Sequence, residues 1–237
     1  MPKPKMFVSH VSEEASLAEA LKSHLSRDFL GLVDIFVSSD LDSIAAGANW
    51  LTSLEQALRD ASALLVLCSR ASLNRPWVNF EVGAAWIKSI PIVPVCHSGL
   101  RPGGLPIPFS VLQGVEANTE GGLKRIYSLV AEKLGCQVPH KDFAKLVAQV
   151  TEFEKAYTPQ IEKAFKAEIE RRSGARGRVY DALADTGHRW RSIERLAVLG
   201  GITEDEVLEL LVQDPNVVFG KGKKHGKRIA RLKSRKG

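Results

Sequence analysis

The chain has 237 residues, 44% of them hydrophobic and 25% charged, which is ordinary for a globular protein with one or two packed domains. Its formal charge of +6 is unevenly distributed. Residues 1–172 carry 19 basic and 19 acidic side chains, whereas residues 173–237 carry 14 and 8. We therefore expect two regions of different electrostatic character.

The cysteine and histidine patterns argue against a metal site. Cys68, Cys96 and Cys136 form no CxxC pair, and the six histidines show no metal-ligand spacing, so we expect reduced thiols and no bound metal. The N-terminal sequence has no apolar stretch as long as a signal peptide, and Lys88 and Pro91 interrupt the most hydrophobic later region. These features predict a soluble cytoplasmic protein that does not enter a membrane.

Strands and helices alternate through the first 135 residues. Short apolar runs predict five strands, at residues 5–9, 33–38, 63–68, 90–96 and 113–117. Apolar residues at helical spacing predict helices between these strands and a closing helix over residues 123–134. Ser12 is expected to cap the first helix, with Glu13 and Glu14 in its first turn. The alternation predicts a doubly wound parallel sheet.

The segment Trp77-Val-Asn-Phe-Glu81 follows the third predicted strand. In open parallel sheets the ligand crevice lies outside the carboxyl ends of the strands, so Glu81 would lie in the first turns of a helix leaving that crevice. A spacing of four places Trp77 and Glu81 on one helix face. An ordinary helix would also fit the segment, with Trp77 and Trp86 as core aromatics and Glu81 as a solvated residue near the helix start.

The order of these segments resembles bacterial Toll/interleukin-receptor (TIR) domains over residues 5–135. The resemblance rests on Ser9-His10 after the first strand, on residues 36–40, 44–50 and 65–69, on the Trp-x-x-x-Glu segment, and on a final Leu105-Pro with Gln113. It implies a flavodoxin-like, doubly wound five-stranded parallel sheet. Among these segments, the Trp-x-x-x-Glu helix is the strongest support for the resemblance.

Many TIR domains of this kind cleave the nicotinamide–ribose bond of NAD⁺, and some also cyclise the ADP-ribose. The glutamate of Trp-x-x-x-Glu is their essential residue, so the resemblance implies that Glu81 is catalytic, that NAD⁺ is the substrate and that no cofactor is needed. Nicotinamide is already a cationic leaving group, so no general acid is required, and a carboxylate can stabilise the oxocarbenium-like ribose that develops.

Residues around the expected crevice are candidate substrate contacts. They are the wall or stacking residues Trp50, Trp77 and Phe80 and the polar residues Ser9, His10, Ser38, Ser39 and Asp40. Ordinary structural roles fit some of them as well. Trp50 and Phe80 could be plain core residues, and Ser39-Asp40 could form an Asx-type turn.

The resemblance also implies assembly. In the family, the loop after the second strand, here residues 39–49, docks on a neighbouring subunit, so we expect a homo-oligomer. The implied role is that of a prokaryotic immune or antiviral effector, regulated through self-association and the C-terminal region. The family also includes non-catalytic adaptors, so the alternative function is a scaffold tethered to nucleic acid or to a partner protein.

The predicted domains are a TIR domain at residues 1–136, a helical connector at 137–172 and a basic C-terminal domain at 173–237. The connector carries an apolar stripe that either packs on the TIR domain or pairs with another chain. Its members are Phe143, Val147, Val150, Phe153, Tyr157, Ile161, Phe165 and Ile169. Pro159 is expected to start a new helix or to kink the existing one.

The C-terminal domain resembles a winged helix-turn-helix. Thr203 and Glu206 form a capping box for its third helix, and residues 217–232 form a hairpin. Residues 221–237 contain nine basic side chains and no acid, which favours contact with a nucleic-acid backbone. The predicted contacts are Lys223, Lys224, Lys227, Arg228 and Arg231. Because the third helix is acidic, a protein-docking module with a solvated basic tail is the alternative.

Overall fold

A computed structural model of the chain describes residues 3–38, 50–185, 187–222 and 226–234. Internal contacts divide the chain into two compact units, Met1–Ile161 and Glu162–Gly237. The first unit holds the whole parallel sheet, and the second holds the basic C-terminal region. The three-part division made from the sequence stays a prediction. No helix within the described ranges is long and apolar enough to cross a membrane.

The first unit contains a five-stranded sheet in the order β2-β1-β3-β4-β5, and all four strand pairs are parallel. The strands are β1 (Lys5–Ser9), β2 (Asp34–Val37), β3 (Ala61–Cys68), β4 (Ile92–Cys96) and β5 (Val115–Glu116). The predicted flavodoxin-like, doubly wound fold is confirmed. β5 is shorter than expected because only its two residues pair with β4. The strand order reverses between β1 and β3, which is where such sheets bind ligands.

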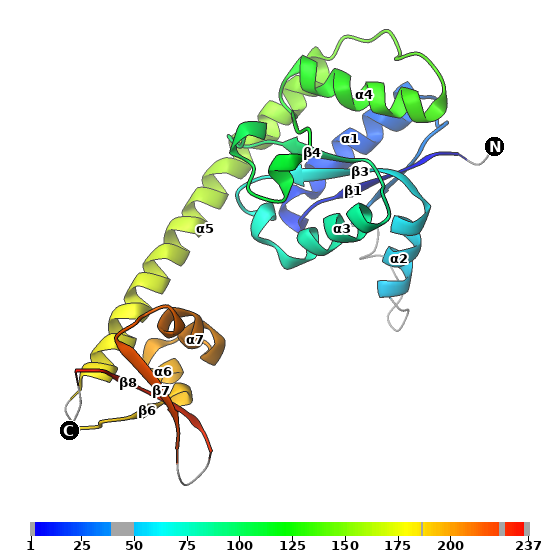
Figure 1. Ribbon diagram of the computed structural model, residues 1–237. Helices are drawn as coiled ribbons and strands as arrows, with labels where there is room; N and C mark the ends of the chain where they lie inside the picture. Colours follow the sequence, from blue (N-terminus) through cyan, green and yellow to red (C-terminus); the bar gives the residue numbers. More distant parts are fainter. Residues whose placement is uncertain (1–2, 39–49, 186, 223–225, 235–237) are drawn as a thin grey trace. The chain divides into compact units, whose positions relative to one another are not determined.

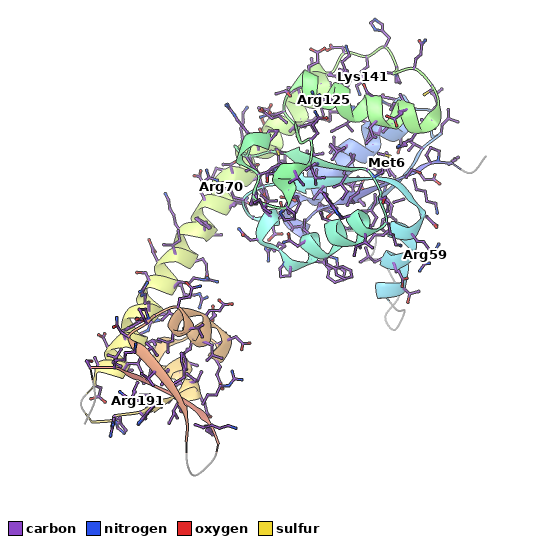
Figure 2. All side chains as sticks on the ribbon, viewed as in Figure 1. Met6, Arg59, Arg70, Arg125, Lys141 and Arg191 are labelled. Carbon is purple, nitrogen blue, oxygen red and sulfur yellow. The ribbon has the colours of Figure 1, made fainter. Side chains whose placement is uncertain are left out.

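Helices cover both faces of this sheet. Figure 1 shows α1 and α4 on one face and α2 and α3 on the other. Their bounds are α1 (Ala15–Asp28), α2 (Trp50–Asp60), α3 (Pro76–Ile87) and α4 (Glu120–Leu134). Alternate residues of β1 enter two separate cores: Met6 and Val8 pack with α1 and α4, and Phe7 packs with α2 and α3. Met6 is labelled on its strand in Figure 2.

Within the described part of this unit, short 3₁₀ turns connect the elements: η1 (Ser12–Glu14), η3 (Ser72–Asn74), η4 (Pro102–Gly104) and η5 (Phe109–Val111). The predicted cap at Ser12 is wrong, because Ser12 begins η1 and α1 starts three residues later, at Ala15. Glu14 takes the N-cap position of α1 and is fully buried. The Val11 N–H donates to Glu14 Oε2 at 3.3 Å.

α5 (Ala144–Ala184) is a single 41-residue helix that begins in the first unit and continues through Pro159, so no new helix starts there. Phe143, Val150 and Tyr157 are buried, and Phe143 and Val150 belong to the core that also contains α1 and α4. The stripe therefore packs on the sheet up to Tyr157. Phe165 and Ile169 are about half exposed, at 53% and 52%.

Lys141 fixes the chain just before α5, and it is labelled in Figure 2. Its Nζ forms an ion pair with Asp28 at the end of α1 and donates to the Tyr127 hydroxyl of α4 at 2.8 Å. The Tyr127 hydroxyl itself donates to Asp28 Oδ2 at 2.7 Å. This cluster joins α1, α4 and the segment leading into α5.

The second unit contains the end of α5, two short helices and a three-stranded antiparallel sheet in the order β6-β8-β7. Its elements after α5 are β6 (Arg191–Ser192), α6 (Ile193–Gly200), α7 (Glu204–Val212), β7 (Val217–Lys221) and β8 (Arg228–Leu232). The predicted capping box of Thr203 and Glu206 and the predicted hairpin are both present. Val179 and Leu183 of α5 belong to the core of this unit.

Candidate active site

Ser9 and Glu81 meet where the strand order reverses. Ser9 is the last residue of β1, and its hydroxyl donates to Glu81 Oε2 from α3. α3 begins at Pro76, whose ring fixes the backbone angle that the first helical position needs. Glu81 lies in the second turn of α3, and both side chains are fully buried. The alternative of a solvated glutamate near a helix start is therefore wrong.

The second oxygen of the Glu81 carboxyl, Oε1, accepts no hydrogen bond of normal geometry among the described residues. Burial raises the pKa of Glu81 from 4.5 to about 7, because the charged form loses its water. The Ser9 hydroxyl and the Trp77 side chain both favour the charged form and oppose this rise. Trp77 therefore lies close enough to the Glu81 carboxyl group to lower its pKa. The carboxyl group therefore exchanges its proton near neutral pH.

Trp77 and Phe80 form a stacked pair beside this carboxyl group. Their ring centroids lie 5.1 Å apart with an interplanar angle of 24°. Phe80 is 51% exposed and Trp86 is 53% exposed, so neither is a core residue. The pair presents an aromatic surface that continues from the buried carboxyl group towards solvent.

His10 and Ser38 join the ends of β1 and β2. His10 Nδ1 lies 2.7 Å from Ser38 Oγ, and the His10 backbone N–H donates to the same hydroxyl at 3.2 Å. His10 follows Ser9 directly, so this pair adjoins the Glu81 site. Ser39 and Asp40 lie outside the described residues. Trp50 begins α2, but its side chain is also outside what the structure describes.

Residues 6–126 match the TIR domain family. The matched residues make up half of the chain and include Ser9, His10, Ser38, Trp77 and Glu81. The chain belongs to the TIR domain family. No curated protein matches it.

A second buried glutamate of the TIR domain, Glu14, was not predicted as a site residue. Its Oε1 accepts hydrogen bonds from Ser69 Oγ at 2.7 Å and from the Tyr157 hydroxyl at 3.1 Å, and it lies 3.1 Å from His97 Nε2. Burial alone would raise the pKa of Glu14, but His97, Ser69 and the Val11 N–H outweigh it, so the pKa is lowered. Glu14 is therefore a stable buried anion.

Ser69, His97 and Glu14 are the residue types of a hydrolase triad, but their order in space is different. The carboxylate contacts both the serine and the histidine, whereas a triad needs the histidine between the other two. All three side chains are buried. The cluster is therefore a structural network. The sequence contained one signal for this network: Ser69 and His97 each follow directly after a predicted strand, and the two strands, β3 and β4, are neighbours in the sheet.

In the second unit, two of the predicted nucleic-acid contacts already have partners. Lys227 forms an ion pair with Glu194, and the Arg231 guanidinium lies 5.0 Å from the centroid of the Trp190 ring. Arg228 is exposed, and Lys223 and Lys224 lie outside the described residues. Within the described parts of the chain, no group of three or more histidine, cysteine or acidic side chains could hold a metal ion.

Proposed function

We propose that the TIR domain cleaves the nicotinamide–ribose bond of NAD⁺, with Glu81 as its catalytic residue. One observation carries the proposal: a fully buried carboxyl group at the switch point of the sheet has one oxygen bound to Ser9 and the other without a hydrogen bond among the described residues. Native proteins rarely leave a buried polar atom unpaired, because this costs about 1–3 kcal/mol. A substrate group is a fitting partner for it.

The chemistry requires little from the protein besides charge and position. The bond between ribose C1′ and the nicotinamide nitrogen breaks, and nicotinamide leaves as a neutral molecule with the bonding electrons. The remaining ribose has oxocarbenium character, which the Glu81 carboxylate stabilises. A water oxygen then bonds to C1′ and loses a proton, which yields ADP-ribose. Attack by the adenine ring in place of water would yield the cyclic product.

Neighbouring side chains have distinct roles in this proposal. Ser9 holds Oε2 and leaves Oε1 for a ribose hydroxyl or for the developing charge. Trp77 and Phe80 offer a ring surface on which a nicotinamide or adenine ring can stack. His10, Ser38, Ser39, Asp40 and Trp50 stay proposed substrate contacts. NAD⁺ serves as substrate, and the chemistry needs no cofactor.

Glu81 is inaccessible to NAD⁺ in the described conformation, since none of its surface is exposed. Catalysis therefore requires a rearrangement around the site. We propose that self-association supplies it, as expected for a cytoplasmic prokaryotic defence effector that depletes NAD⁺ when triggered. The half-exposed Phe165 and Ile169 of α5 are apolar side chains that another copy could cover.

We infer that the second unit is a winged-helix module that senses or docks the trigger. Its antiparallel sheet and paired short helices support this inference, and the basic segment at residues 221–237 favours a nucleic-acid backbone. Glu204 and Asp205 in the first turn of α7 disfavour base reading through that helix, because they would repel phosphates. A protein partner is the alternative.

The deciding experiment incubates the purified full chain with NAD⁺, with and without DNA or RNA, and separates nicotinamide, ADP-ribose and cyclic ADP-ribose by chromatography. Nicotinamide release by the wild type, but not by Glu81→Gln, supports the proposal. Intact NAD⁺ under all conditions, including high protein concentration, would favour the non-catalytic scaffold.

A further inference from the structure

α5 binds loops at the carboxyl edge of the sheet through two side chains, Tyr157 and Glu154. The Tyr157 hydroxyl donates to Glu14 Oε1 at 3.1 Å and lies 3.0 Å from Ser69 Oγ. Glu154 accepts the backbone N–H of Ser98 at 2.7 Å and the side-chain N–H of Asn118 at 2.9 Å. A spacing of three places Tyr157 and Glu154 on the same face of the helix.

Two of the segments that α5 contacts lead directly to the proposed active site. Glu14 is the last residue of η1, and η1 follows shortly after Ser9 and His10 at the end of β1. Ser69 begins the loop that leads from β3 into α3, and α3 carries Trp77 and Glu81. A shift in either loop would thus change the distance between Ser9 and Glu81.

Glu14, Ser69 and His97 form a rigid network, which we call the Glu14 network, so a shift of α5 would be passed on to the loops that carry these residues. Glu14, Ser69 and His97 are at most 1% exposed, and both carboxyl oxygens of Glu14 accept hydrogen bonds. The aromatic rings of Tyr157 and Phe153 pack on the His97 ring, with centroids 5.5 and 5.6 Å away. Fully paired polar networks of this kind rigidify a buried region.

α5 lies outside residues 6–126, the part of the chain that matches the TIR domain family. The helix therefore adds a support to the carboxyl edge that the matched segment does not contain. We propose that Tyr157 and Glu154 are positioning residues for the Glu81 site and act through Glu14, Ser69 and Ser98. This inference rests on the proposed function of that site, but one of its tests does not.

The first test compares two tyrosine-to-phenylalanine variants of the full chain. Tyr157→Phe removes the hydroxyl that binds Glu14, and Tyr127→Phe removes a hydroxyl that binds Asp28, a carboxylate at the far end of α1. Both tyrosines are buried and both lose a bond to a carboxylate, so both variants should lose stability. We expect Tyr157→Phe to lower the kcat of NAD⁺ cleavage at least about tenfold with little change in KM, and Tyr127→Phe to leave kcat within about twofold.

Glu154→Gln should repeat the kcat loss, because the Ser98 and Asn118 N–H groups bind different carboxylate oxygens, and in glutamine one of these positions becomes an NH₂ group that cannot accept. Its matched control is Glu152→Gln, a change at an exposed position two residues earlier on the same helix. Equal kcat values for Tyr157→Phe and wild type, or equal losses in Tyr157→Phe and Tyr127→Phe, would overturn the proposal.

The second test needs no activity. In ¹⁵N-labelled full chain, the indole N–H resonance of Trp77, identified by its absence in Trp77→Phe, reports the geometry beside Glu81. Tyr157→Phe should shift this resonance and Tyr127→Phe should not. An unmoved resonance in Tyr157→Phe overturns the positioning role. If the wild type cleaves no NAD⁺, the proposed function fails separately, and the resonance alone decides the coupling.

Discussion

Glu81→Gln should stabilise the folded protein at alkaline pH while it abolishes NAD⁺ cleavage. The reason is the raised pKa of Glu81, about 7 in the folded protein against an ordinary value of 4.5. Above pH 7 the folded chain must hold a buried charge that the unfolded chain exposes to water. Glutamine has nearly the same size and can still accept the Ser9 hydrogen bond, but it carries no charge.

The magnitude follows from this pKa difference. A rise from 4.5 to about 7 is about 2.5 pKa units, which corresponds to about 3 kcal/mol of folding free energy. This destabilisation of the folded state is absent well below pH 4.5, where the Glu81 carboxyl is protonated in both the folded and the unfolded chain. It reaches its full size as the pH rises through 7. A stabilisation of this size should raise Tm by roughly 6–12 °C at pH 8 for a unit of this size, and hardly at all at pH 4.5.

Glu14→Gln is the matched control, since it is the same substitution at an equally buried carboxyl group. The pKa of Glu14 is lowered, so its charge stabilises the fold above the ordinary pKa and this contribution is lost as the pH falls. Glu14→Gln should therefore lower Tm at pH 8. Calorimetric scans of the wild type and both variants at pH 8 and pH 4.5 measure the contrast.

Two outcomes would refute this reasoning about Glu81. One is a lower Tm for Glu81→Gln than for wild type at pH 8, and the other is an equal Tm change at both pH values.

Turnover of NAD⁺ by Glu81→Gln should fall by several orders of magnitude. Activity within about tenfold of wild type, or about 1.4 kcal/mol of barrier, would remove Glu81 from the catalytic role.

Three further predictions concern the same proposals. Ser9→Ala removes a donor that favours the charged form of Glu81, so the acid limb of the pH profile of kcat/KM should move to higher pH, and an unmoved limb would contradict the Ser9 role. Specific activity should rise with protein concentration; a flat profile from a chain that light scattering shows to be monomeric would exclude control by self-association. Replacing Lys223, Lys224 and Lys227 by glutamate should weaken nucleic-acid binding for all sequences and flatten its salt dependence in gel shifts. If the wild type fails to bind DNA or RNA at low salt, the second unit must dock a protein.

The sequence was sufficient to predict the fold because its strands are short apolar runs between clear helical patterns. The strand 63–68 is apolar at every position, as expected for a strand buried on both faces, and the structure extends it by two residues to Ala61. Errors occurred at element ends, where local signals compete. Ser12 has the right residue type for a helix cap, but a 3₁₀ turn takes its place and delays α1.

The Glu81 site was predictable in part because its geometry follows from sequence spacing and from the sheet order. Trp77 and Glu81 are four positions apart in the sequence, and both follow a strand that adjoins the reversal of strand order. The Glu14 network was not predictable in this way. Tyr157 is 143 residues from Glu14, and the periodicity that placed it on a buried stripe says nothing of the partner of its hydroxyl.

Burial alone does not distinguish the two glutamates, because both are fully enclosed at the same edge of the sheet. What differs is the number of groups that favour the charged form: His97, Ser69 and the Val11 N–H act on Glu14, whereas only Ser9 and Trp77 act on Glu81 among the described residues. The pKa values accordingly move in opposite directions, down for Glu14 and up for Glu81. A carboxyl group whose charge destabilises the fold is better explained by substrate binding than by packing, since a neutral residue of the same shape would serve the fold better.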